Sequence, residues 1–427
     1  MKKVLLVLVC PVLFASIPID STEIPFELSN QNYYQLTAQV FTNDVRTIPS
    51  NPNVYHEIFT YFDKELTEVD NQIQPNQPFT IIGVDVNQNN QLIFQLSNKS
   101  YIQADASVIY DDVILAQEST KVTYWLKKGF QVYSNPIINQ GKKIATTQKA
   151  YSSVEATEIV DTHRGQFAKI EGVGWISTDD LSLTDNRMEA VQELLNSRYQ
   201  NATNISVYVK QLSTQNTAGV HQDRMMYAAS VTKLATLYYV QHQLDQGKYQ
   251  LSQGLQYVKQ TEEFKGAYIP TGSGSIVKNP DNIHYRIDDL INRVAKESDN
   301  VASNILAYYI TNQFDDDFTK IITDITGQRW DMENRQANAK MAGLLMEEIY
   351  YQGGYVLGSL QSTNFDNQRI SRDINTTVAH KIGDAYDFRH DVAIIYADSP
   401  FVLSIFTENS TYDMISQIAN DVYGILK

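Results

Sequence analysis

The hydrophobic pattern of this chain changes near residue 184, and that change limits the folds it can adopt. Between residues 22 and 183, apolar and β-branched residues come in short runs separated by Asn, Pro and Gly, a pattern typical of strands joined by turns. After residue 184, longer runs with helical spacing alternate with short apolar runs. With 427 residues, the chain is long enough for two or three domains. We therefore expect small all-β modules before a larger domain of helices and strands.

The larger domain is expected to span residues 184–427 and to mix helices with strands. Helical spacing predicts helices, and alternation or short apolar runs predict strands. Helices are expected over 185–195, 229–240, 288–297, 300–309, 338–350 and 412–426, and strands over 205–212, 378–381, 392–396 and 402–407. This order fits an α/β (α+β) domain in which an antiparallel sheet is flanked by helices and a helical subdomain is inserted.

Ser230 and Lys233 stand at the start of the predicted helix 229–240. Residues three apart on a helix lie on the same side, so the amine can reach the hydroxyl. A buried lysine has a lowered pKa and can take the proton of a serine, which makes the serine a nucleophile. Free N–H groups at a helix start can also hold an oxyanion. The alternative is a helix-capping serine beside an ordinary surface lysine.

The same spacing occurs again at Ser275 and Lys278, so the motif is weak evidence by itself. That copy lies in Thr271-Gly272-Ser273-Gly274 and runs into Asn279-Pro280, which favours turns and leaves no room for a helix. The first copy is therefore the better candidate.

Two later motifs support a catalytic role for Ser230 and Lys233. Ser298-Asp299-Asn300 lies between two predicted helices, and Lys381-Ile382-Gly383 opens a predicted strand. In this order the three motifs resemble the Ser-x-x-Lys, Ser-Asp-Asn and Lys-Thr-Gly signature of penicillin-binding proteins and class A β-lactamases. The alternative for Ser298-Asp299-Asn300 is a simple turn between helices.

The resemblance implies a role for each matching residue. Ser230 would attack a carbonyl and form an acyl-enzyme, and Lys233 would take its proton. Ser298 would relay a proton to the leaving group, Asn300 would hold the substrate amide, and Lys381 would raise the local positive potential. Ile382 and Gly383 would line the substrate site, and the backbone N–H groups of Ser230 and Asp384 would form the oxyanion hole.

The third motif departs from the family pattern at two positions. Ile382 replaces the hydroxyl residue that helps to bind a substrate carboxylate, which removes a polar contact worth about 1 kcal/mol or more. Asp384 follows directly, and its charge would repel an anionic substrate unless the side chain points away.

The segment after the second motif is also unusual. Class A β-lactamases carry there a glutamate that activates the deacylating water. Here Ile325–Asn334 runs almost directly into the helix at 338, and Glu333 is the nearby candidate for that base. A solvated turn residue is the alternative reading of Glu333. We therefore expect slow deacylation.

Two passages of the first half resemble each other, each with a strand, a polar turn, a second strand and an aromatic-Ile pair. They predict two modules, 22–120 and 121–183, each a small barrel. The second contains Val132–Pro136 and Gly174-Trp175-Ile176 and resembles the GW or SH3-like modules of cell-wall proteins; the first has Ser100-Tyr101-Ile102 instead. The resemblance implies adhesion to wall polymer. The alternative is a spacer with Trp175 and Tyr101 buried in the cores.

Residues 1–21 combine Met1-Lys2-Lys3 with an apolar run, the layout of an export signal, or alternatively of an uncleaved membrane anchor. We therefore expect an exported, extracellular or cell-surface protein. Cys10, the one cysteine, would leave with the signal, so no disulfide is expected. The net charge of −15 and the absence of a basic stripe argue against a nucleic-acid partner. The seven histidines are scattered, and we expect neither metal nor cofactor.

Together these features predict an exported serine hydrolase of the class A β-lactamase-like family, acting on β-lactams or peptidoglycan stem peptides. The alternative is a catalytically decayed protein that binds cell wall. Retention of Ser230, Lys233, Ser298, Asn300 and Lys381 argues against decay, whereas Ile382 and Asp384 argue for it.

Overall fold

The computed structural model describes residue 45, residues 47–137 and residues 139–427. Contacts divide the chain into two compact units. One unit runs to Ile114 and includes Ile137–Gly141, and the other comprises Leu115–Pro136 and Lys142–Lys427. The expected export signal and residues 22–44 of the first module lie outside the described residues.

The first unit is all-β. Its main sheet has five strands in the order β3-β2-β6-β5-β4, and β1 pairs with β7 beside it. The strands are β1 (Pro52–Val54), β2 (Ile58–Tyr61), β3 (Val69–Ile73), β4 (Ile81–Val86), β5 (Leu92–Leu96), β6 (Tyr101–Gln103) and β7 (Ile109–Asp111). Phe94, Leu96 and Ile102 are buried in one apolar cluster, so the strands share a small core.

A second five-stranded sheet, in the order β11-β10-β9-β8-β12, begins the other unit. Its strands are β8 (Ile114–Leu126), β9 (Ser153–Thr162), β10 (Gly165–Ile170), β11 (Gly174–Ser177) and β12 (Leu181–Ser182). The module boundary predicted at residue 120 falls inside β8, which is one continuous strand. The contacts divide the chain earlier, after Ile114, because most of β8 belongs to the second sheet.

The two similar passages fold alike, as antiparallel ladders β4-β5-β6 and β9-β10-β11. In each, the isoleucine of the aromatic-Ile pair is buried, with Ile102 1% and Ile176 0% exposed. Tyr101 and Trp175 are only half-buried, so neither aromatic residue is a core residue. Gly174 has φ +137°, and a Cβ there would lie 2.7 Å from the Tyr133 carbonyl oxygen. A glycine is therefore required before Trp175.

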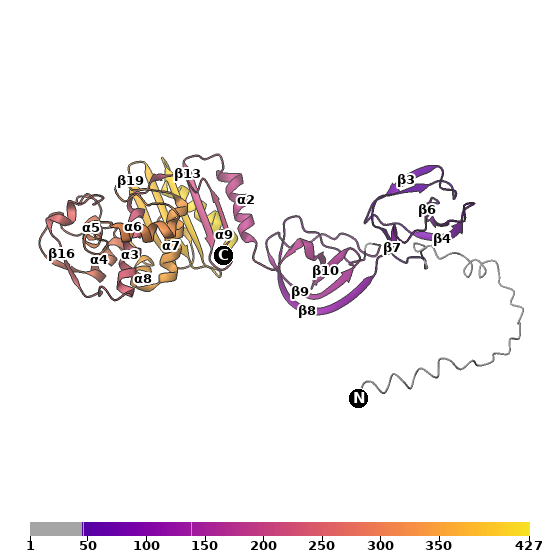
Figure 1. Ribbon diagram of the computed structural model, residues 1–427, viewed down its shortest axis with the longest axis horizontal. Coiled ribbons are helices and arrows are strands. Elements are labelled where there is room, and N and C mark those ends of the chain that lie inside the picture. The colour runs from indigo at the N-terminus through magenta and orange to yellow at the C-terminus, as the bar shows by residue number, and fades with distance from the viewer. Residues whose placement is uncertain (1–44, 46, 138) are drawn as a thin grey trace, which may run out of the picture. The chain divides into compact units, whose positions relative to one another are not determined.

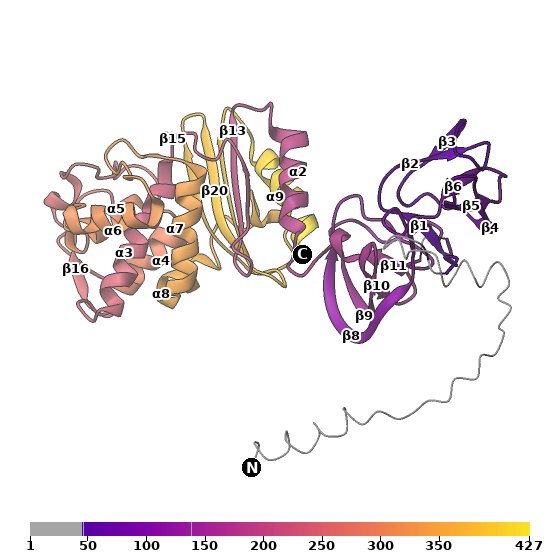
Figure 2. The ribbon, with the colours of Figure 1, turned by 45° about the vertical axis from the view of Figure 1, so that its right-hand side comes forward.

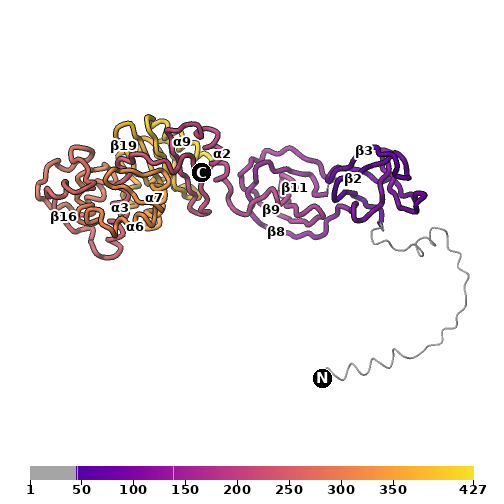
Figure 3. Tube along the Cα trace, turned by 45° about the horizontal axis from the view of Figure 1, so that its top comes forward, coloured from indigo at the N-terminus to yellow at the C-terminus, as the bar shows by residue number. Residues whose placement is uncertain are grey.

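The larger domain is built on a five-stranded antiparallel sheet in the order β14-β13-β21-β20-β19. The strands are β13 (Ile205–Gln211), β14 (Thr217–Val220), β19 (Val378–Ala385), β20 (Phe388–Ile395) and β21 (Phe401–Glu408). The first and last helices, α2 (Arg187–Tyr199) and α9 (Tyr412–Leu426), pack together on one face, so the two ends of the domain meet (Figures 1 and 3).

The opposite face of the sheet is covered by α7 (Ala339–Gln352), and the remaining helices gather beyond it (Figure 2). These are α3 (Lys233–Asp245), α4 (Ile287–Lys296), α5 (Asn300–Tyr309), α6 (Asp316–Thr326) and α8 (Gly354–Leu360), with short strands β15 (Met226–Tyr227), β16 (Gly254–Gln256), β17 (His284–Arg286) and β18 (Gln336–Ala337). The sheet thus separates two apolar cores, one under α2 and α9 and one among the helices. The predicted antiparallel sheet with an inserted helical subdomain is confirmed.

Within the described part of the chain, no helix combines the length and apolar character that a bilayer crossing needs. The same residues contain no group of three or more His, Cys, Asp or Glu side chains suited to holding a metal ion.

Candidate active site

Ser230 lies in a short 3-10 turn, η3 (Ala229–Thr232), that leads directly into α3. The sequence places Ser230 at the start of an α-helix, but the α-helix begins three residues later, at Lys233. Ala229 has φ +49°, a left-handed conformation that is unfavourable for a residue with a Cβ. Such strain persists where the surrounding structure enforces it, often at functional sites. The turn leaves the Ser230 hydroxyl partly exposed while Lys233 is buried.

The second motif forms the junction between α4 and α5. Ser298 has φ +56°, and the Asp299 carboxylate caps α5 by accepting from the Ala302 N–H at 2.9 Å. The same carboxylate accepts from the N–H groups of Ser275 and Ile276. Asp299 therefore fixes the loop, while Ser298 and Asn300 on either side turn toward Lys233.

Lys381 lies on β19, the outer strand of the sheet beside the helical subdomain. Gly383 allows this strand to approach the nucleophile turn, since a Cβ at Gly383 would lie 2.7 Å from the Ala228 carbonyl oxygen. Any side chain at Gly383 would push the strand away from Ser230.

These three segments bring five side chains together. Lys233 Nζ lies 3.0 Å from Ser230 Oγ, 3.3 Å from Ser298 Oγ and 2.7 Å from Asn300 Oδ1. It also donates to the Ser298 carbonyl oxygen at 2.6 Å. Lys381 Nζ donates to Ser298 Oγ at 2.9 Å and to the Ile382 carbonyl oxygen at 3.0 Å. Ser298 Oγ therefore stands between the two amines.

Both lysines are buried, and this shapes their charge. Burial, and then the nearby Lys381 charge, hold the pKa of Lys233 well below its ordinary value of 10.5. Burial lowers the pKa of Lys381 to about 7, against the opposing effect of Asp391. Among the described residues, neither amine has a hydrogen bond or ion pair with a carboxylate. The surroundings of both amines thus disfavour their charged forms, and a lowered pKa suits a general base.

Tyr268 and Arg335 belong to the same site, although no sequence motif marks them. The Tyr268 ring lies 4.3 Å from Lys233 Nζ and 4.1 Å from the Arg335 guanidinium carbon. Arg335 donates to the carbonyl oxygens of Gly266 and Ala267, which holds this segment in place. No spacing rule in the sequence predicts that residues 268 and 335 contact residue 233.

A family model described as the β-lactamase enzyme family matches residues 186–426, more than half of the chain. The chain belongs to the β-lactamase enzyme family. The match begins at the N-cap of α2 and ends in α9, so it covers the larger domain and leaves the N-terminal modules unassigned.

Several solved structures resemble this family member at low identity. A β-lactamase from Sphaerobacter thermophilus is 18% identical, with a TM-score of 0.45, and the match covers 56% of this chain and 95% of that chain. PBP-A gives the same identity, TM-score and coverage. TLA-1, an extended-spectrum β-lactamase, is 17% identical with a TM-score of 0.45, over 57% of this chain and 99% of that one. No curated protein matches the sequence.

The structure shows what surrounds Ile382 and Asp384, the two residues at which the third motif departs from the family pattern. The Ile382 side chain is 5% exposed, so the position that would carry a hydroxyl is a buried apolar one. The Asp384 carboxylate accepts from Arg369 Nη2 at 2.6 Å and from the Tyr412 hydroxyl. Its charge is therefore paired with a cation of the chain.

Glu333 is exposed and lines a hollow of about 540 Å³ with Lys265, Arg329 and Trp330. Among the described residues, no contact joins Glu333 to Ser230 or Lys233. Arg335, two residues later, is the side chain of this segment that reaches the surroundings of Lys233. The assignment of Glu333 as deacylation base stays a prediction.

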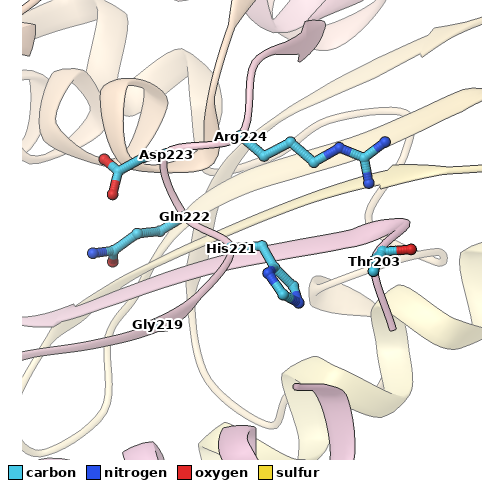
Figure 4. Close-up of a pocket in the computed structure, with 6 residues that line it drawn as sticks. All are labelled: Thr203, Gly219, His221, Gln222, Asp223 and Arg224. Atoms are coloured by element: carbon cyan, nitrogen blue, oxygen red, sulfur yellow. The ribbon is translucent and has the colours of Figure 1, made fainter. Parts of the chain in front are cut away.

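The other candidates lie apart from this cluster. In the second Ser-x-x-Lys copy, Lys278 Nζ donates to the Gly274 carbonyl oxygen within a loop, as the turn residues predict. A hollow of about 570 Å³ follows β14, and its lining contains none of the predicted site residues (Figure 4). His221 and Arg224 in that hollow already pair with the Gln200 carbonyl oxygen and with Glu408.

Proposed function

We propose that this family member is an active-site serine hydrolase that works through an acyl-enzyme on Ser230. The observation that carries the proposal is the environment of Lys233 Nζ. It faces two carbonyl-type acceptors, Ser298 O at 2.6 Å and Asn300 Oδ1 at 2.7 Å, and the Ser230 hydroxyl at 3.0 Å. A neutral amine gives its two N–H bonds to the two acceptors and turns its lone pair toward the Ser230 O–H. That is the arrangement of a general base beside a nucleophile.

Ser298 supports the second half of the acylation step. As the Ser230 oxygen bonds to the acyl carbon, the leaving group needs a proton. Ser298 Oγ lies within 3.3 Å of Lys233 Nζ and 2.9 Å of Lys381 Nζ, so it can pass a proton from the amines to the leaving atom. The backbone N–H groups of Ser230 and Asp384 belong to the two segments that meet at Gly383, and they are our candidates for the oxyanion hole.

Deacylation is expected to be slow. The space next to Lys233 holds the Tyr268 ring, with Arg335 against it, and no carboxylate of the described residues contacts Lys233. Without a base that activates water, an acyl-enzyme persists. The behaviour would resemble that of a penicillin-binding protein or peptidoglycan peptidase more than that of an efficient β-lactamase. β-Lactams and peptidoglycan stem peptides are the proposed substrates.

We also propose that the protein is exported and that its N-terminal modules bind cell-wall polymer. The basic and apolar N-terminus supports export. The half-buried Trp175 supports binding, because it lines a hollow of about 500 Å³ with Lys169 and the loop Glu171–Gly174. A sacculus pull-down with the full chain and with Trp175→Ala tests this part, and equal retention would count against it.

A labelled penicillin tests the chemistry. The full chain should gain the mass of one penicillin on Ser230, and Ser230→Ala should gain none. An absent adduct, with Ser230→Ala equal to wild type in hydrolysis assays, would leave the decayed wall-binding protein. Once the adduct forms, nitrocefin turnover separates the two enzyme readings: slow release supports a persistent acyl-enzyme, and fast turnover supports a β-lactamase.

A further inference from the structure

The rim of the proposed cleft carries an unusual charge arrangement around Arg369. This side chain is 1% exposed, and its guanidinium lies over the Tyr412 ring at 3.8 Å. Nη1 donates to Gln368 Oε1 at 2.7 Å, and Nη2 donates to the Asp384 carboxylate at 2.6 Å. A buried guanidinium is costly unless a carboxylate compensates it. In this chain the compensating anion is Asp384.

Asp384 is next to Gly383, the residue that brings β19 against the nucleophile turn. Alternation along the strand puts Lys381 and Gly383 on one face and Ile382 and Asp384 on the other. The Asp384 side chain is 33% exposed whereas Arg369 is 1% exposed, so a protein carboxylate covers Arg369 where β19 meets the nucleophile turn. A substrate carboxylate would have to displace it.

The other groups that could bind a substrate carboxylate are also engaged or missing. Ile382 offers no hydroxyl and is buried. Lys381 Nζ already donates to Ser298 Oγ and the Ile382 carbonyl oxygen. Arg389, the cross-strand partner of Asp384, is half-exposed and is a second cation beside that carboxylate. It faces the same Asp384 charge.

We propose that the site prefers acyl donors without a free carboxylate on the leaving group, such as an internal peptide bond or an amidated stem peptide, over donors that carry one, as penicillins do, and that Asp384 sets this preference by occupying Arg369. This inference rests on the proposed acyl-enzyme at Ser230 and names its substrate class. The side chains of Asp384 and Arg369 determine specificity in this scheme, since they act through charge at the rim; only the Asp384 backbone N–H is a candidate for the oxyanion hole.

Two depsipeptide donors test the proposal: an N-acyl-D-alanyl-D-lactic acid and its lactamide, which differ only in a carboxylate or a carboxamide on the leaving group. Ser230 attacks the same ester in both, the C–O bond to the lactyl oxygen breaks, and the proton of Ser230 leaves with that oxygen. The rate of adduct formation on Ser230 is followed by intact-protein mass spectrometry of the full chain. The ratio of acid rate to amide rate, taken within each variant, cancels differences in folded fraction.

For wild type we expect a ratio below one. Asp384→Asn should raise it at least tenfold by freeing Arg369, and Ile382→Thr should raise it at least threefold by restoring a hydroxyl. Arg389→Gln is the matched control for the second rim cation, and its ratio should fall or stay within twofold. A wild-type ratio of one or more, or an Asp384→Asn ratio raised less than tenfold over wild type, would overturn the inference while leaving the acyl-enzyme intact. No Ser230 adduct with either donor would overturn the proposed function together with this inference.

Discussion

Two neighbouring residues of β19, His380 and Lys381, are buried to the same extent and meet opposite electrostatic environments. Burial lowers the pKa of Lys381 to about 7. Burial also opposes a charge on His380, but Asp391 and Asp366 outweigh it and raise the pKa of His380 to about 9. His380 Nδ1 lies 3.0 Å from the Asp391 carboxylate, and Nε2 lies 3.1 Å from Asp366 Oδ1.

The difference lies in the partners. His380 contacts two carboxylates, so the buried imidazole keeps its charge and has a structural role. Among the described residues, Lys233 and Lys381 hydrogen-bond only to hydroxyl and carbonyl oxygens, so their pKa values fall and the amines can exchange protons. Burial by itself therefore does not distinguish a structural charge from a catalytic one. A carboxylate in hydrogen-bonding contact does, because Asp391 also acts on Lys381 but without such a contact its effect is smaller than that of burial.

The largest expected effect concerns Lys233 and the rate at which Ser230 is acylated. Lys233→Met keeps the apolar stem and removes the amine, so acylation of Ser230 by a fluorescent penicillin should slow by about 10²–10⁴-fold, the usual contribution of a general base. Lys278→Met removes the lysine of the other Ser-x-x-Lys copy and should leave the rate within about twofold. Equal rates for wild type and Lys233→Met would break the comparison, because Lys233 would then be another structural group.

On the opposite face, Asp391→Asn removes the fully buried partner of His380. Breaking a buried ion pair costs about 3–5 kcal/mol, and the loss should fall at the low end because His380 can release its proton. Urea unfolding at pH 7 measures this loss of unfolding free energy. The exposed pair Lys320–Asp324 provides the control, and Asp324→Asn should cost less than about 0.5 kcal/mol.

The charge on His380 also predicts how stability depends on pH. The pKa is about 9 in the folded chain and 6.5 in the ordinary imidazole, so folding favours the protonated form. This stabilisation is complete below about pH 6.5 and is lost as pH rises through 9, by about 3 kcal/mol at most. Unfolding free energies of wild type and His380→Asn between pH 6 and 10 should converge as the pH rises. A constant difference would show that His380 is neutral in the folded chain.

The smallest expected effect concerns Glu333, the one carboxylate predicted to serve the cleft. Because its side chain is exposed and contacts neither Ser230 nor Lys233 among the described residues, Glu333→Gln should change the release of the penicilloyl group less than about twofold. Release is followed by loss of label from the purified adduct. A 10²-fold or larger decrease in the release rate, the size expected for loss of a base, would place a carboxylate at the cleft. That result would weaken the contrast between His380 and the buried lysines.

Much of the larger domain could be predicted from sequence. Strands β13 and β21 and helices α4, α5, α7 and α9 lie close to their predicted ranges, because their apolar periodicity is strong. Ser230, Lys233, Ser298, Asn300 and Lys381 were identified by three short motifs, and the structure joins them in one network through Lys233 and Ser298.

The tertiary structure decided which residues become neighbours, and no local sequence pattern records that. Motif spacing says nothing about which side chain fills the space beside Lys233, so Tyr268 and Arg335 went unnoticed. The charge at Asp384 looked hostile to catalysis until Arg369, fifteen residues away, proved to be its partner. The boundary predicted at residue 120 falls inside β8 for a related reason, since pairing with distant strands determines which sheet a strand joins. Sequence fixes the chemistry that each residue can perform, whereas long-range packing fixes the neighbours that set its charge.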